Sequence, residues 1–388
     1  MNSVEKTISL IENNPQLSRR DFLKLLATLG IDFLLPIEKL TPAELLKLPP
    51  NPNLPAVGFS IVPREIAPHY PGEPVIMTMN FGDLEIGGYG EGFRKAKGQR
   101  TLKIEQYPKD KPLSLLEWEN YIKTVISRYS GVERVIVGNE CNVPKNQGSY
   151  MSPEEYASCY GTAWRAIRSF SPETRVSLYG EAYYGNHTHL RNVLQLLKNK
   201  GIRPDEGSVH FYDYPQKLGY WLVGYQNVLN EFFGDVPIHI SEIGKPISIS
   251  INDEQHASLL VQDLALSAAY IEQGKITLAA WFAAATFNKD QSFSIFRFSK
   301  TVNGKLEPSC LVIPWLLVTR ALHHQVKPIE TRGLIMISGL TADNHQALVL
   351  WSKTGQSISF NPPRNMLPYN LYGQEIRPMC STNPIFLL

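Results

Sequence analysis

The chain has 388 residues, of which 43% are hydrophobic, and a formal net charge of +2 from 38 basic and 36 acidic residues. A chain of this length and composition can bury a large core as a globular protein. Because the charges are balanced and neither sign forms a long run, we expect no nucleic-acid-binding surface. No apolar run is long and uninterrupted enough to predict a stable membrane span.

The composition also argues against a metal or a cofactor. No pair of cysteines has the Cys-x-x-Cys spacing of a zinc ribbon or a thioredoxin-type site, and we expect small buried thiols rather than a disulfide framework. No group of histidines and carboxylates has the spacing of a metal site, and the glycine-rich segment at residues 87–92 lacks the dinucleotide-binding pattern. The sequence therefore predicts neither a cofactor nor a metal. The cysteines are Cys141, Cys159, Cys310 and Cys380.

The N-terminal segment matches a twin-arginine export signal. Ser18-Arg19-Arg20-Asp21-Phe22-Leu23-Lys24 carries the pattern at every position, and an apolar run, Leu25–Leu35, follows it. Asp32 interrupts that run and no Ala-x-Ala cleavage site follows, so an amphipathic N-terminal helix is the alternative. We expect export to the periplasm or the cell exterior, with residues 1–55 forming a leader and a Pro-rich linker.

After the linker, apolar runs alternate with amphipathic segments, as in a parallel sheet with crossover helices. A (β/α)₈ barrel takes about 250 residues as a single domain, which fits residues 56–328. The predicted strands are Ala56–Val62, Val75–Phe81, Thr101–Tyr107, Arg134–Asn139, Arg175–Tyr179, Gly207–Tyr212, Ile238–Glu242 and Ile276–Phe282. The predicted helices are Ser114–Tyr129, Pro153–Ser169, His189–Asn199, Gly219–Phe233 and Asp253–Gln273.

The pattern changes near Glu330 to short strands separated by turn residues. Residues 329–388 are too few for a full β-sandwich, so we expect a small β-rich C-terminal region packed on the barrel. The predicted fold class is α/β: a (β/α)₈ TIM barrel with a small C-terminal β-appendage. The strands predicted in the appendage are Gly333–Gly339, Gln346–Trp351, Ser357–Phe360 and Leu367–Tyr372.

Two of the predicted barrel strands end in a glutamate. Glu140 ends the run that starts at Arg134, and Glu242 ends the run that starts at Val236. The C-terminal ends of barrel strands form the catalytic face, so the two carboxylates are expected to converge there. Two such carboxylates are the minimum needed to break a glycosidic bond, provided that their surroundings separate their pKa values.

Four other residues are predicted to complete this site. Asn139 offers an amide for a sugar hydroxyl, and Trp281 offers a flat apolar surface for a pyranose ring. His210 and Tyr212 are two residues apart on one strand, so their side chains lie on the same side of it. A tyrosine hydroxyl beside an ionised carboxylate can hold that carboxylate ready for attack.

These residues make the chain resemble the retaining glycoside hydrolases of clan A, which share a (β/α)₈ barrel. Asn139-Glu140, His210-Phe211-Tyr212, Glu242 and Trp281 fall in the clan's order on the predicted fourth, sixth, seventh and eighth strands. The resemblance spans roughly residues 56–322 and indicates no single family. It implies that Glu140 is the acid/base and Glu242 the nucleophile, acting on a β-linked oligo- or polysaccharide.

One departure from the clan keeps an alternative open. The clan carries an arginine near the end of strand two that supports the nucleophile, and Val75–Gly82 contains none. A catalytically degenerate barrel that binds carbohydrate without cleaving it is therefore the second hypothesis. Glu105 and Glu181 are further candidates to face the cleft, although solvated carboxylates are the expected outcome for both.

Overall fold

The computed structural model describes residues 16–17, 42–45, 47–49, 51–54, 75–79, 93, 99–105, 113–143, 150–182, 186–245, 251–282, 296–298, 306–330, 333–360, 362–363 and 366–388. Contacts divide the chain into two compact units. The barrel unit contains Pro52–Lys245 and Gly274–Glu307, and the C-terminal unit contains Met1–Asn51, Pro246–Gln273 and Pro308–Leu388. The domain boundaries at residues 55 and 328 stay a prediction from the sequence.

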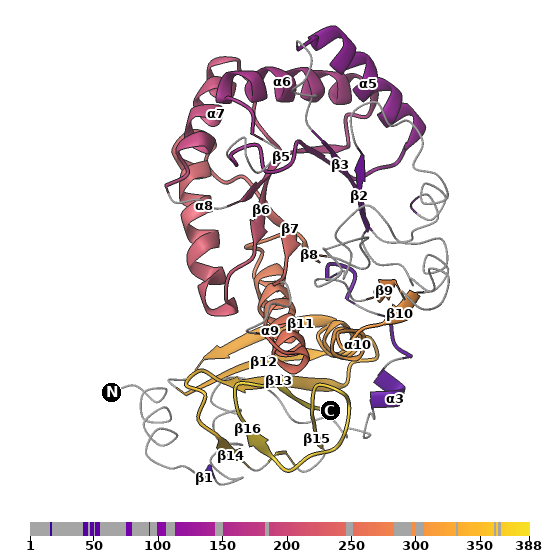
Figure 1. The fold of residues 1–388 in the computed structure, drawn as a ribbon, viewed down its shortest axis with the longest axis vertical. Coiled ribbons are helices and arrows are strands. Elements are labelled where there is room, and N and C mark those ends of the chain that lie inside the picture. Colours follow the sequence, from indigo (N-terminus) through magenta and orange to yellow (C-terminus); the bar gives the residue numbers. More distant parts are fainter. Residues whose placement is uncertain are drawn as a thin grey trace. The chain divides into compact units, whose positions relative to one another are not determined.

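Seven parallel strands, β2 to β8, form the sheet of the barrel unit and pair with one another in chain order (Figure 1). They correspond to seven of the eight predicted barrel strands, and the remaining one, Ala56–Val62, lies outside the described residues. The strands are β2 (Val75–Met79), β3 (Arg100–Ile104), β4 (Arg134–Val137), β5 (Arg175–Ala182), β6 (Glu206–Phe211), β7 (Ile238–Ile243) and β8 (Ala279–Trp281).

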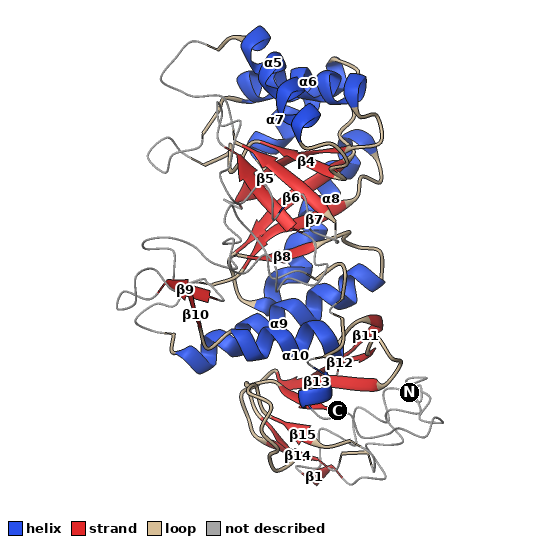
Figure 2. Cartoon of the chain, turned by 90° about the vertical axis from the view of Figure 1, so that its right-hand side faces the viewer, coloured by secondary structure: helices blue, strands red, loops and turns tan. Residues whose placement is uncertain are grey.

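Amphipathic helices follow the strands and lie along the outside of the curled sheet (Figures 1 and 2). Each begins close to its predicted start. Ser152 accepts a hydrogen bond from the Glu155 backbone N–H, and the Glu155 carboxylate accepts one from the Ser152 N–H, which is a complete capping box. The helices are α5 (Leu115–Arg128), α6 (Pro153–Phe170), α7 (Thr188–Asn199) and α8 (Leu218–Phe233), with a 3₁₀ turn, η3 (Pro215–Lys217). Two short strands, β9 (Phe296–Phe298) and β10 (Leu306–Pro308), pair with each other.

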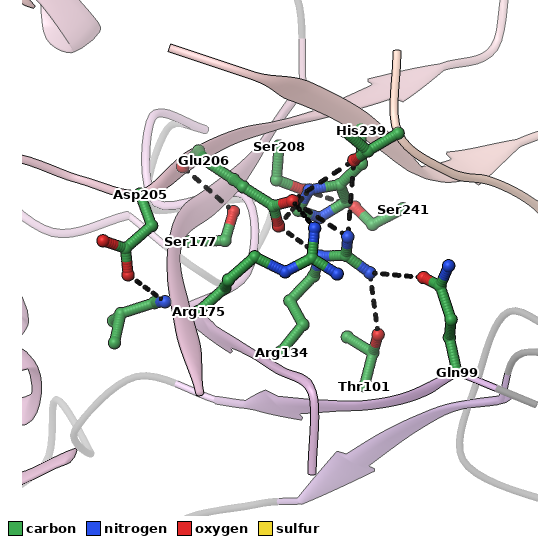
Figure 3. A network of polar contacts seen from close by, with 12 residues as sticks. Gln99, Thr101, Arg134, Arg175, Ser177, Asp205, Glu206, Ser208, His239 and Ser241 are labelled. Atoms are coloured by element: carbon green, nitrogen blue, oxygen red, sulfur yellow. Dashed lines mark hydrogen bonds and ion pairs between the residues drawn. The ribbon is translucent and has the colours of Figure 1, made fainter. Parts of the chain in front are cut away.

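A buried polar network joins the N-terminal ends of the barrel strands (Figure 3). At its centre the guanidinium of Arg134 from β4 donates two hydrogen bonds to the carboxylate of Glu206 from β6. Arg175 from β5 donates to the same carboxylate at 2.7 Å, and Thr101 from β3 accepts a hydrogen bond from Arg134. His239 from β7 lies 3.5 Å from Glu206. The network thus links five strands through one buried carboxylate.

This network favours the ionised form of Glu206. Burial alone would raise the pKa of Glu206, but hydrogen bonds from Arg134 and His239 and the charge of Arg134 bring it well below its usual range. A lowered folded-state pKa contributes stability that is complete above the unfolded pKa and is lost as the pH falls through the folded pKa. Burial and the charge of Arg134 lower the pKa of His239 to about 4, so the imidazole is neutral at neutral pH.

The C-terminal unit contains the predicted β-appendage. Its main sheet is antiparallel, in the order β11-β12-β13-β17-β15, and α9 contacts β11 and β12 while α10 contacts β13. A second sheet has the order β1-β14-β16. The elements are β1 (Gln16–Leu17), α3 (Pro42–Leu45), α9 (Asp253–Glu272), α10 (Val312–Ala321), β11 (His324–Glu330), β12 (Leu334–Leu340), β13 (Gln346–Ser352), β14 (Ile358–Phe360), β15 (Pro368–Tyr369), β16 (Met379–Cys380) and β17 (Ile385–Leu387).

Among the helices within the described ranges, none combines the length and apolarity needed to cross a bilayer.

The network predicts a large loss of stability when its central arginine is removed. Arg134→Met leaves the buried Glu206 carboxylate without its main partner, and we expect the free energy of unfolding in urea to fall by about 3–5 kcal/mol. Arg191→Ala is the matched control, because the Arg191–Glu231 pair is largely exposed, with side chains 38% and 47% accessible. Breaking that pair should change stability by less than about 1 kcal/mol. Equal losses in the two variants would contradict this reading of the network.

Candidate active site

Glu140 is held at the C-terminal end of β4 by a fixed turn. The Gly138 N–H donates to the Ile104 carbonyl at 2.7 Å, and the Glu140 N–H donates to the Gly180 carbonyl at 3.0 Å. Gly138 has a φ of 86°, and a Cβ there would lie 2.7 Å from the Cys141 sulfur, so glycine is required. Glu140 itself has a φ of 45°, an unfavourable backbone conformation of the kind found at functional sites. The turn thus aims the carboxylate at the strand ends.

Glu242 reaches the same place from β7 through a β-bulge. Ser208 pairs with His239, but the next pair on that face joins His210 to Glu242, so β7 contains one extra residue. Ser241 contacts Ser208 at 2.6 Å on the inner face of the sheet, and the adjacent Glu242 also contacts inward-facing side chains. Regular alternation would turn Glu242 to the opposite face. The bulge therefore delivers the second carboxylate to the inner face.

His210 lies between the two glutamates. Its Nδ1 forms a hydrogen bond of 2.7 Å with Glu140 Oε1. Its Nε2 forms an ion-pair contact of 2.8 Å with Glu242 Oε1. One ligand-type atom from each of the three residues lies within 4.8 Å of the others. The structure therefore brings together two predicted glutamates and the predicted histidine in one buried group.

The close approach of His210 depends on a glycine in the neighbouring strand. A Cβ on Gly180 would lie 2.0 Å from His210 Nε2, inside any permitted contact. The missing side chain on β5 therefore makes the space that the imidazole occupies.

Two more polar side chains contact Glu242, and a third, Asn139, contacts one of them. The Tyr212 hydroxyl donates to Glu242 Oε2, as predicted from its position two residues after His210. The Lys103 ammonium, from β3, lies 3.2 Å from Glu242 Oε1 and donates to Asn139 Oδ1 at 2.9 Å. Asn139 thus lies in the site as predicted, whereas Lys103 was not identified from the sequence. Its signal was a lysine inside a predicted strand, two residues before Glu105 and between two apolar residues.

The electrostatics of this group favour a charged imidazole. Burial would lower the pKa of His210, but the charges of Glu242 and Glu140 and the hydrogen bond to Glu140 raise it above its ordinary value. Burial likewise would raise the pKa of Glu140, but the hydrogen bond and charge of His210, with the charge of Lys103, lower it. An imidazolium can donate from both nitrogens, which matches the two carboxylates it faces.

Glu105 is a third carboxyl in the site. It follows β3, and its Oε1 lies 3.8 Å from Lys103 Nζ. Burial raises the pKa of Glu105; the charge of Lys103 opposes this, and the charge of Glu242 adds to it. With a side chain only 20% exposed, Glu105 is not the solvated carboxylate that the sequence led us to expect.

Glu181 does not join the group, and the expectation that it would be solvated is also wrong. It is 3% exposed, and its Oε2 contacts His187 Nδ1 at 2.8 Å. Burial raises the pKa of this carboxyl, against the hydrogen bond and charge of His187. Gly180 faces His210, so its neighbour in the strand, Glu181, points to the other side of the sheet.

Trp281 lies in β8 and is fully buried. A sugar ring can stack on the indole only if a face of it becomes exposed, so its role as the floor of a subsite stays a prediction. Glu140, His210 and Glu242 are also the one set among the described residues that could hold a metal ion. Their ligand atoms already contact one another, and the Lys103 cation beside Glu242 disfavours the addition of a metal cation.

No family model matches the chain, and no curated protein matches it. Solved structures do share its fold. AbfB, a family 51 α-L-arabinofuranosidase from Bifidobacterium longum, aligns over 88% of this chain and 98% of its own, with a TM-score of 0.61 and 10% identity. BuGH86 in complex with neoagarooctaose aligns over 84% and 62%, with a TM-score of 0.55 and 14% identity. The GH30 xylanase C catalytic domain from Talaromyces cellulolyticus aligns over 88% and 96%, with a TM-score of 0.51 and 10% identity.

These proteins are glycoside hydrolases of clan A, and the chain resembles them in fold without belonging to an identified family. At such low identity the likeness establishes the fold alone. With the parallel sheet and the antiparallel C-terminal sheet, it confirms the predicted class, a (β/α)₈-type barrel with a β-rich appendage.

The contacts of His210 predict an abnormal titration. Because two carboxylates favour the imidazolium, we expect His210 to keep its proton to a higher pH than a solvated histidine, as measured by NMR titration of the ring protons. Glu140→Gln removes one of these carboxylates and should lower the pKa of His210. Glu173→Gln changes an exposed carboxyl outside the group and should leave it unchanged. A His210 titration unaffected by Glu140→Gln would argue against the bridge.

Proposed function

We propose that the protein is a retaining glycoside hydrolase that cleaves β-linked oligo- or polysaccharides by double displacement on Glu242 and Glu140. The observation that carries this proposal is the pairing of the two carboxylates, with an oxygen of each within 4.8 Å of the other. Retaining enzymes hold their carboxyl groups about 5–5.5 Å apart, whereas inverting enzymes leave about 6.5–9.5 Å for a water molecule. The spacing favours direct attack by a carboxylate.

In the first step the Glu242 carboxylate attacks the anomeric carbon. The bond to the leaving oxygen breaks as Glu140 gives that oxygen a proton, and a glycosyl ester of Glu242 forms. In the second step Glu140 accepts a proton from water, the water oxygen bonds to the anomeric carbon, and Glu242 is released as a carboxylate. The second step thus regenerates the ionised Glu242 and the protonated Glu140 with which the first step began.

The electrostatics favour a proton on His210 over a proton on Glu140. The pKa of Glu140 is lowered and that of His210 is raised, and both shifts favour the proton on the imidazole over the carboxyl. A sugar over Glu140, whose side chain is 27% exposed, removes water from the carboxyl and raises its pKa. The 2.7 Å contact with His210 Nδ1 then gives the proton a direct path to Glu140. Substrate binding thereby favours the protonated form of Glu140, which is the form that acts as the acid.

The remaining residues position the substrate and the nucleophile. Asn139 lies next to Glu140 and is placed to bond a sugar hydroxyl, while Tyr212 and His210 both contact Glu242. Trp281 is assigned to the sugar-binding surface on the clan resemblance alone. The structural neighbours include an arabinofuranosidase and a xylanase, so the sugar and the linkage are not defined by the fold.

The alternative of a degenerate carbohydrate-binding barrel rested on the missing strand-two arginine. The contact of Lys103 with Glu242 supplies a cation to the nucleophile by another route, which supports hydrolysis over binding alone. Export through the twin-arginine segment is a further proposal, because residues 18–35 lie outside the described part, and cell fractionation tests it.

The proposal predicts different effects for the two glutamates. Glu242→Gln should abolish turnover of an activated aryl glycoside, because the amide cannot form the ester, while circular dichroism shows an intact fold. Glu140→Ala should slow poor leaving groups far more than good ones, because a good leaving group needs little protonation.

The matched control is Glu231→Gln, which alters an exposed carboxylate on α8 and should keep normal rates. Normal turnover in both the Glu242 and the Glu140 variants, over a broad panel of aryl glycosides, would falsify the proposed function.

A further inference from the structure

Lys103 belongs to the site, but it takes no direct part in the two steps of the double displacement. It lies in the middle of β3, and its side chain is fully buried. A buried lysine is costly unless its charge is paired and its donors are used. Its ammonium contacts Glu242 Oε1 at 3.2 Å and Asn139 Oδ1 at 2.9 Å, so it meets both conditions inside the site.

These two contacts reach across the inner face of the sheet. Asn139 follows β4, which neighbours β3, but Glu242 belongs to β7, four strands away in the order of the sheet. One ammonium therefore fixes the position of two side chains that come from separate strands. Thr101, on the same face of β3, instead contacts Arg134 in the network at the other end of the strands.

We propose that Lys103 is a positioning residue that holds Glu242 as an oriented carboxylate and fixes the amide of Asn139, in place of the strand-two arginine of clan A. The inference rests on the proposed function. Lysine is suited to this task because an ammonium carries three donors and no acceptor. Asn139 must then turn its carbonyl oxygen to Lys103, which presents the amide NH₂ as the donor for a sugar hydroxyl.

The charges around Lys103 define what its removal should do. The charged groups around it are Glu242 from β7, Glu105 after β3 and Glu140 after β4, and His210 from β6 contacts the same Glu242 oxygen as Lys103 does. Lys103 and His210 are thus the two cations among three carboxyls. Without Lys103, the Glu242 carboxylate keeps a single cationic neighbour, His210.

Lys103→Met tests this role, because methionine fills a similar volume without the charge. For an activated aryl glycoside we expect kcat to fall on the order of 10- to 100-fold, the usual effect of removing a residue that orients a reacting group. The acidic limb of the pH–rate profile should move up by about one pH unit or more. KM should change little, because a fully buried side chain does not touch the substrate. Thr101→Val is the matched control on the same face of β3, and it should keep the wild-type pH profile.

A double-mutant cycle tests the same contact without relying on turnover. The free energy of unfolding is measured for the wild type, Lys103→Met, Glu242→Gln and the double variant. Lys103→Met should destabilise the wild type more than it destabilises Glu242→Gln, because the second background has no buried carboxylate left unpaired. If Lys103→Met alone does not fold, the double variant still should, and that outcome also reports the coupling.

The two experiments separate the possible failures. A wild-type protein that cleaves no glycoside contradicts the proposed function, and the cycle then decides the Lys103–Glu242 contact by itself. Wild-type kcat and pH profile in folded Lys103→Met, or additive stabilities in the cycle, overturn the role of Lys103 and leave the proposed function standing.

Discussion

The site depends on keeping two like charges close together, one buried and one partly exposed. Glu140 and Glu242 have oxygens within 4.8 Å of each other, a separation at which two carboxylates repel strongly in a low-dielectric interior. Two cations on the same inner face reduce this repulsion: His210 lies between the glutamates and Lys103 lies beside Glu242. Three local features make this arrangement possible, because each one brings a charged group to its partner. They are the bulge in β7, the missing side chain at Gly180 and the turn that carries Glu140.

On the inner face of the sheet, a structural network and the candidate active site lie at opposite ends of the strands. At the N-terminal ends, Arg134 and Glu206 form a buried ion pair whose donors and acceptors are used within the network (Figure 3). At the C-terminal ends, Glu140 and Glu105 remain partly exposed and their pKa values move in opposite directions. This division matches the general rule that barrels hold their catalytic groups at the C-terminal face and their structural ones at the other. One charged cluster thus stabilises the fold at the N-terminal ends of the strands, and the other is the site of the proposed proton transfer.

Much of this could be predicted from the sequence, because β-branched apolar runs ending in polar residues define the strands and their C-terminal ends. That reasoning placed Glu140, His210 and Glu242 near one another. It could not foresee that Ser241 and Glu242 would both face inward, since a bulge breaks the alternation on which the argument relies. The sequence also did not identify Lys103, because a lysine in a strand normally points to solvent. Its burial is stabilised by two partners that only the structure reveals, Asn139 after β4 and Glu242 on β7.

The central claim is that Glu242 forms a covalent bond to the sugar. A 2-deoxy-2-fluoro glycoside with a good leaving group, chosen to match the aryl glycoside that the protein cleaves fastest, slows the second step so that the glycosyl ester accumulates. Peptide mass spectrometry of the inactivated protein then locates the added sugar. The account predicts one fluorosugar per chain, attached to the peptide through Glu242. A sugar attached to Glu140 or elsewhere, or hydrolysis with inverted stereochemistry and no labelled peptide, would contradict it.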